Sequence, residues 1–299
     1  MKERLVAGLY LLAWYVLPRI PESWAQGLFR TIADIAWRRQ GPGVQRLEAN
    51  LLRVEPDADG KRLRALSRAG MRSYMRYWLE AFRLPSYDRE RIAERLYVGN
   101  YQAIPDCLES GRGVVLALPH MGNWDHAGAW LALKGVPFTT VVERLRPERL
   151  YEAFVGFRES LGMEVLPLTG SGFVSGTLAR RLRAGRLVCL VADRDITASG
   201  VEVKFFGERV SMAAGPAALA LQTGAALMPV TLWFTEDGCE ARVHDEVTVP
   251  EDGDRASRVA EMTQRMADAF AEGIAAHPQD WHMLQRIFLA DPVPGEAER

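Results

Sequence analysis

The alternation of short apolar runs with longer amphipathic stretches, which begins after Gly111, is the feature that most restricts the fold. The runs GVVLALP (113–119), FTTVV (138–142) and RLVCLVA (186–192) have the length and composition of buried strands. Between such runs, apolar residues recur at helical spacing, as in 255–276. Strands that alternate with helices form parallel sheets, because each helix returns the chain to the same edge. The sequence therefore predicts an α/β fold with a central, mostly parallel β-sheet flanked by helices.

The N-terminal part lacks this alternation and is predicted to be a helical segment. Its apolar run LVAGLYLLAWYVL (5–17) is shorter than the about 20 residues of a transmembrane helix. Aromatic and arginine side chains of the kind found where acyl chains meet headgroups are Trp14, Tyr15, Arg19, Trp24, Arg30, Trp37, Arg38 and Arg39. We interpret 1–42 as an amphipathic, membrane-associating segment and 43–299 as a single α/β domain. An N-terminal helix that only packs on the core is the alternative.

Net charge, cysteine spacing and one glycine-rich segment give no sign of nucleic-acid binding, disulfides or a phosphate-binding loop. The formal net charge of -1 gives no overall attraction to nucleic acid, so an anionic ligand would have to meet local arginines. Cys107, Cys189 and Cys239 are far apart and odd in number, as expected of reduced core residues in a cytoplasmic protein. The segment GSGFVSG (170–176) lacks the P-loop lysine and is not a GxSxG motif, which favours a turn and a helix cap.

Charged side chains interrupt the stretch VVLALPHMGNWDHAGAWLA (114–132), where a predicted strand passes into a predicted helix. His120 follows the carboxyl end of the strand, which is where open α/β sheets bind ligands. Residues five apart in a continuous helix point in different directions, so His120 and Asp125 can meet only through a turn. Gly122 permits that turn, and Asn123 or Asp125 can cap the helix. We predict that Asp125 holds one imidazole nitrogen and leaves the other free to accept a proton.

Other interpretations of these residues remain open on the sequence alone. His120 can be a capping or packed histidine, and His126 is a rival for its role. The two histidines with Asp125 could also bind a metal ion, but no further cluster of histidines or cysteines accompanies them, so no metal is expected.

Further charged residues follow the ends of other predicted strands. Glu143 and Arg144 come after FTTVV, and Asp193 and Arg194 come after RLVCLVA. At a common sheet edge they can bind a polar headgroup, and Glu143 can steady the base. Solvated surface charges, or a cap at Asp195, are the alternatives.

The residues around His120 resemble those of a known family. His120-Met-Gly-Asn-Trp-Asp125 matches the HxxxxD signature of glycerolipid-type acyltransferases, and ALPHMGNWDHAGAWLA resembles the branch with the lipid A lauroyl and myristoyl acyltransferases. The resemblance continues in order through RSYMRYWLEAFRLP, VVERLRPERLYEAFVGFRESLGMEVLP, LVADRD, GVEVKFFGERVSMAAGPAALALQTGAALMPV and HPQDWHMLQRIF. It covers nearly the whole chain and implies a glycerol-3-phosphate acyltransferase-like fold.

Within that branch the chain is similar to the actinobacterial phosphatidylinositol mannoside acyltransferases. The resemblance implies transfer of a fatty acyl group, typically palmitoyl, from acyl-CoA to a mannose hydroxyl at the cytoplasmic face of the inner membrane. It implies acyl-CoA as co-substrate and no cofactor. His120 would be the general base and Asp125 its orienting partner, with backbone N–H groups near Gly122 to Trp124, or a nearby arginine, as oxyanion donors. Residues expected at the substrate site are Asn123, Glu143, Arg144, Arg158, Asp193, Arg194 and Glu202.

Three alternatives stay open beside this expectation. A lipid A-type or other glycolipid can be the acceptor. The same histidine and aspartate can instead use water, which would make the protein an acyl-thioester hydrolase. A non-catalytic lipid-binding protein is the third possibility.

Overall fold

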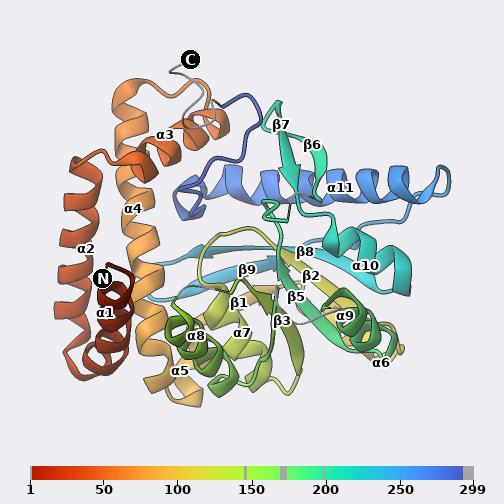
Figure 1. Cartoon of the computed structure of the whole chain (residues 1–299), viewed down its shortest axis with the longest axis horizontal. Helices are drawn as coiled ribbons and strands as arrows, with labels where there is room; N and C mark the ends of the chain where they lie inside the picture. The colour runs from red at the N-terminus through yellow and green to blue at the C-terminus, as the bar shows by residue number, and fades with distance from the viewer. Residues whose placement is uncertain (1, 145–146, 169–173, 198, 292–299) are drawn as a thin grey trace.

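A central β-sheet with helices on both faces forms the body of the protein, and a wall of N-terminal helices stands along one side (Figure 1). The computed structural model describes residues 2–144, 147–168, 174–197 and 199–291. The sheet has seven strands in the order β1-β9-β8-β2-β5-β3-β4. Their bounds are β1 Leu96–Gly99, β2 Val114–Leu118, β3 Phe138–Val142, β4 Glu164–Pro167, β5 Leu187–Val191, β8 Ala226–Phe234 and β9 Cys239–Val243. The α/β prediction is confirmed.

The sheet is parallel except at one edge. Strands β8, β2, β5, β3 and β4 run in the same direction, whereas β9 is antiparallel to β8 and β1 is parallel to β9. Only a short link joins β8 to β9, and a short link can make a hairpin but not a parallel crossover. A separate antiparallel hairpin consists of β6 (Val201–Phe205) and β7 (Glu208–Met212).

Helices cover each face of the sheet because side chains alternate along its strands. Val115 and Ala117 of β2 face one core with α9 (Val174–Arg183), α10 (Gly215–Thr223) and α11 (Arg255–Ala276). Leu116 and Leu118 face the opposite core, with α6 (Ala103–Glu109) and α7 (Trp124–Leu133). Both faces of β2 are therefore buried, which explains its unbroken apolar run.

The N-terminal helices are α1 (Lys2–Val16), α2 (Glu22–Arg38), α3 (Pro42–Val54) and α4 (Gly60–Arg83). Asp34 of α2 is bound by Arg68 and Arg72 of α4, at distances between 2.6 and 3.0 Å. Trp37, expected at a membrane surface, instead packs against α3 and α4, and its indole N–H donates to Ser67 at 2.9 Å. These contacts hold α2 firmly against the rest of the chain.

An apolar surface nevertheless remains exposed on the outer side of α1 and α2. Trp24 has 75% of its surface exposed. The other large exposed side chains of this surface are Leu9, Leu12, Tyr15, Val16, Leu28, Ile32 and Ile35. Trp14, in contrast, turns inward and packs against Phe82 and Phe154. Within the described ranges, every helix is too short or too polar to cross a membrane.

Several local features escaped the sequence prediction. Helix α6 and the β6–β7 hairpin were not predicted. Most of the GSGFVSG segment lies outside the described residues. Cys189 and Cys239 are buried, Cys107 is half-buried, and all three are free thiols.

Candidate active site

His120 lies just past the carboxyl end of β2, and its partner is Asp193, just past the end of β5. The imidazole Nδ1 lies 2.5 Å from Asp193 Oδ1, and the His120 backbone N–H donates to Oδ2 at 2.9 Å. Leu118 and Val191 are register partners in the paired strands. His120 and Asp193 each follow this pair by two residues. Two neighbouring parallel strands thus deliver the histidine and the carboxylate to one point.

Asp193 is held as an anion. Burial alone would raise the pKa of Asp193, but the charge of His120 and hydrogen bonds from His120 and Trp281 outweigh burial and lower it. An ionised carboxylate can only accept, so Nδ1 carries the proton that points at Asp193. The Nε2 atom is left as the basic nitrogen, and the side chain is 26% exposed. A substrate hydroxyl can therefore reach it.

The predicted contact between His120 and Asp125 is wrong. Asp125 is buried, and its carboxylate accepts from the Tyr77 hydroxyl at 2.8 Å and from Arg158 at 2.7 and 3.3 Å. Asp125 sits in the first turn of α7, on the side that faces α4 and α8 (Glu148–Ser160), whereas His120 precedes the turn. The carboxylate therefore ties three helices together instead of orienting the imidazole.

The charge of Asp125 raises the pKa of both Arg158 and Tyr77. Burial alone would lower the pKa of Arg158, but the attraction of Asp125 raises it above its ordinary value. Burial, and then the negative charge of Asp125, raise the pKa of Tyr77, so the phenol stays a donor. A buried charge pair of this kind depends on both partners, because removing one leaves the other unpaired.

The loop between β2 and α7 turns at Gly122, as the sequence predicted. Gly122 has φ of +59°, and a Cβ atom there would lie 2.8 Å from the backbone of Leu232, so only glycine fits. Its N–H donates to the Asp280 carbonyl, which removes it from the predicted oxyanion donors. Asn123 is a cap and not an exposed substrate ligand: its amide is fully buried between the His126 N–H and Glu80.

His126 is held inside the fold. It lies in the first turn of α7, and its Nε2 donates to the Ile92 carbonyl at 3.0 Å. Burial lowers its pKa. These contacts fit a neutral, structural histidine and not a rival to His120.

Of the remaining predicted substrate residues, Arg194 and Glu143 lie near each other, whereas Arg144 and Glu202 form ion pairs elsewhere. Arg194 follows Asp193, and its guanidinium lies 4.0 Å from the exposed carboxylate of Glu143, so the ends of β5 and β3 do bring charges together. Arg144 pairs instead with Glu148 on the exposed start of α8. Glu202 pairs with Arg209 across the β6–β7 hairpin, outside the main sheet.

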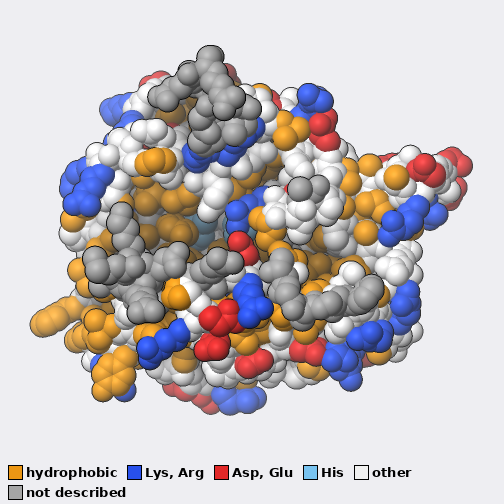
Figure 2. Space-filling view, viewed as in Figure 1, with side chains coloured by type: hydrophobic (Ala, Val, Ile, Leu, Met, Phe, Trp, Pro, Cys, Tyr) orange, Lys and Arg blue, Asp and Glu red, His pale blue; other side chains and the backbone are white. Residues whose placement is uncertain are grey.

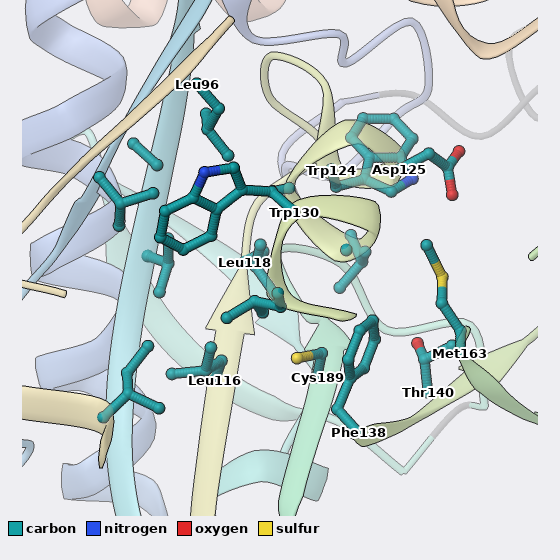
Figure 3. Close-up of a pocket in the computed structure, with 18 of the residues that line it drawn as sticks. Leu96, Leu116, Leu118, Trp124, Asp125, Trp130, Phe138, Thr140, Met163 and Cys189 are labelled. Carbon is teal, nitrogen blue, oxygen red and sulfur yellow. The ribbon is translucent and has the colours of Figure 1, made fainter. Parts of the chain in front are cut away.

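A narrow apolar cavity lies between α7 and the sheet, next to this site. Its volume is about 90 Å³. Figure 3 shows Leu116, Leu118, Trp130 and Phe138 facing this space, with Asp125 at its margin. Figure 2 shows a hollow on this face of the molecule, with hydrophobic side chains and a histidine inside it. The walls are almost entirely hydrophobic, as expected for a site that receives an apolar chain.

Trp124 connects the cavity to the histidine. Its ring lines the cavity and meets the His120 ring edge-on, with the centroids 5.8 Å apart. Tyr77 stacks on the same indole, with 4.2 Å between the ring centroids. Asp125 and Arg158 also line the cavity, so the charged pair forms part of its wall beside Trp124. The cavity and the basic nitrogen thus belong to one site.

Residues 2–290 match the family described as bacterial lipid A biosynthesis acyltransferase. The chain belongs to this family. A phosphatidylinositol mannoside acyltransferase from Mycolicibacterium smegmatis is 50% identical over 285 residues, which cover 94% of this chain and 91% of that protein. A protein of the same name from Mycobacterium tuberculosis is 46% identical, over 94% of this chain and 88% of its own. The family confirms the expected resemblance and the class of enzyme, an acyltransferase.

Sequence reasoning missed the roles of three residues in this site. Asp193 was predicted to bind substrate and not to hold the histidine. Tyr77 and Trp281 were not singled out at all, although both contribute hydrogen bonds to the two carboxylates. The sequence does hold one signal for this pairing: His120 and Asp193 each lie two residues beyond the end of a strand. The signal identifies a contact only when β2 and β5 are known to be neighbours.

Proposed function

We propose that the protein transfers a fatty acyl group, palmitoyl in the first instance, from acyl-CoA to a mannose hydroxyl of a phosphatidylinositol mannoside. The observation that carries the proposal is the His120–Asp193 pair beside an apolar cavity. The names of the two relatives support the acceptor. The cavity would hold the acyl chain, and the thioester would lie at its mouth, near Trp124.

His120 acts as the general base in this proposal. A sugar hydroxyl is too weak an acid to attack a thioester unaided, whereas a neutral imidazole accepts its proton as the bond forms. The hydroxyl oxygen bonds to the thioester carbon while Nε2 takes the proton. The carbon–sulfur bond then breaks, and the proton passes from His120 to the departing thiolate. Asp193 keeps the proton-accepting nitrogen aimed outward and stabilises the imidazolium.

Release of CoA should depend strongly on the glycolipid acceptor. We expect CoA to appear much faster from palmitoyl-CoA when phosphatidylinositol mannoside is present than when it is absent, because the hydroxyl is the intended nucleophile. Thiol detection measures the rate, and a mass spectrum of the lipid shows the added acyl group. Lipid A precursor serves as a competing acceptor. Equal CoA release without acceptor would instead identify a thioester hydrolase.

The exposed apolar surface of α1 and α2 is proposed to rest on the cytoplasmic face of the plasma membrane. Trp24, Leu28, Ile32 and Ile35 recur at helical spacing on one side of α2, while Asp34 on the other side is bound to α4. Large apolar side chains project at the left edge of Figure 2, where Figure 1 places these helices. A firmly anchored helix that still exposes an apolar stripe is typical of interfacial binding.

Replacing this stripe should weaken membrane binding. Burying a large apolar side chain contributes about 1.5–3 kcal/mol, so the Trp24→Ser, Leu28→Ser, Ile32→Ser triple variant should bind vesicles at least about tenfold more weakly. Sedimentation with vesicles of phosphatidylethanolamine and phosphatidylinositol measures the effect. The matched control changes three exposed residues elsewhere, Leu52, Val249 and Leu289, to serine. If both variants bind as the parent does, another surface contacts the membrane.

A further inference from the structure

A C-terminal segment pairs with the loop that carries His120. The His282 N–H donates to the His120 carbonyl at 2.7 Å, and the Asp280 carbonyl accepts from Gly122 at 3.0 Å. Between these bonds, Met121 and Trp281 form an antiparallel bridge. The segment follows α11 and η3 (Pro278–Asp280), so residues more than 150 positions apart are joined at the site. The backbone of the loop that carries His120 is thereby fixed to the C-terminal segment.

Trp281 also reaches the carboxylate directly. Its indole N–H donates to Asp193 Oδ2 at 3.0 Å, the same oxygen that accepts from the His120 backbone. The side chain is fully buried. Rings of Phe205 and Phe206 lie against the indole, with centroids 5.9 and 6.1 Å away. Oδ2 is therefore held by two fixed donors, and Oδ1 is left for the imidazole.

Phe206 occupies an unusual backbone conformation beside this contact. It has φ of +46° in the two-residue turn of the β6–β7 hairpin, where glycine or asparagine is usual. A bulky residue in the left-handed region costs free energy and persists only where its surroundings demand it. Here its ring packs against Trp281, so the hairpin turn supports the indole.

We propose that Trp281 is a positioning residue for acyl transfer, whose indole N–H locks the Asp193 carboxylate so that His120 presents an unprotonated Nε2 to the acceptor hydroxyl. The inference rests on the proposed function, since it assumes that His120 is the base. Trp281 touches neither the reacting atoms nor the cavity, and it acts only through Asp193. Without its N–H, one of the two donors that fix Oδ2 is gone, and the carboxylate can rotate away from Nδ1.

Loss of the indole N–H should also change how the pair titrates. A donor to the carboxylate stabilises the state in which Asp193 is charged and His120 is neutral, relative to the protonated pair. Removing the donor therefore makes the pair easier to protonate, and activity should be lost at a higher pH than in the parent. Burial lowers the pKa of the adjacent His282 to about 3, so this group stays neutral throughout. Burial raises the pKa of Asp280 to about 6, a titration that parent and variant share.

The test is Trp281→Phe, assayed in detergent micelles with palmitoyl-CoA and a phosphatidylinositol mannoside. We expect kcat to fall about tenfold or more, since a hydrogen bond to a charged group is typically worth one to two factors of ten. The KM for palmitoyl-CoA should stay unchanged, because the cavity is untouched. The acidic limb of the kcat profile should move to higher pH by up to about one unit.

Two control variants separate this role from packing. Trp37→Phe removes another indole hydrogen bond, to Ser67. Phe205→Leu loosens the packing around Trp281 without removing its N–H. Both should retain the parent pH profile. An unchanged kcat and profile in Trp281→Phe would overturn the inference, and so would a loss of kcat with an unmoved limb and a lowered melting temperature. Full activity of a His120→Ala variant would instead overturn the proposed function itself, whatever Trp281→Phe does.

Discussion

His120→Ala is expected to lower kcat for acyl transfer by roughly 10²–10⁴-fold, because the acceptor hydroxyl loses the base that takes its proton. The fold should survive, since the side chain is partly exposed and its backbone bonds to Asp193 and His282 do not depend on the imidazole. Initial rates of CoA release with saturating acceptor measure the loss. Circular dichroism and the melting temperature of the same preparation show whether the protein is folded.

The matched control for this variant is His277→Ala. His277 stacks on Trp233 at the end of α11, with 4.4 Å between the ring centroids, and its backbone carbonyl accepts from the Asp280 N–H, a bond that alanine keeps. We expect it to keep the parent kcat. Should His120→Ala also keep the parent kcat in the folded state, general-base catalysis by this residue is excluded, and the cavity would have to serve lipid binding alone.

Asp193→Asn should lower kcat by about 10⁴-fold, comparable to the loss when the aspartate of a serine-protease triad is replaced by asparagine. An amide NH₂ facing Nδ1 favours the tautomer with the proton on Nε2, and that nitrogen can no longer accept. The rate of acyl transfer at several pH values measures the effect. The free energy of unfolding, from urea titration, should change much less than the rate.

Asp125→Asn makes the informative comparison, because the HxxxxD signature directs attention to Asp125. Its loss leaves the Arg158 charge buried without an anion, so we expect the free energy of unfolding to fall by about 3–5 kcal/mol. A loss of kcat equal to that of Asp193→Asn, in a protein of unchanged stability, would return the orienting role to Asp125.

The sequence predicted strands β2, β3 and β5 and helix α11 because their signals are local. The run from Val114 to Leu118 is apolar on both faces, and Gly122 marks a turn that only glycine can make. The position of His120 at a sheet end followed from the same local pattern. These parts of the site needed no knowledge of the order of the strands.

The partner of His120 could not be predicted in this way. Asp125 is near in sequence and Asp193 is 73 positions away, yet the adjacency of β2 and β5 decides the pairing. Strand order results from packing over the whole sheet, which no short stretch encodes. Arg158 shows the converse: its place beside the site was predicted, but its pairing with Asp125 was not. Glu202 lies on an unpredicted hairpin, so its direction could not be foreseen.

The lining of the cavity reaches across six neighbouring strands, from β3 through β5, β2, β8 and β9 to β1. Adjacent strands lie about 4.8 Å apart, so this floor is roughly 24 Å wide. The antiparallel edge made by β9 and β1 forms its far end, well away from the His120–Asp193 pair. Changes at that edge can alter the space available to a chain without disturbing the pair. The far end of the cavity is thus formed by strands other than the two that carry His120 and Asp193.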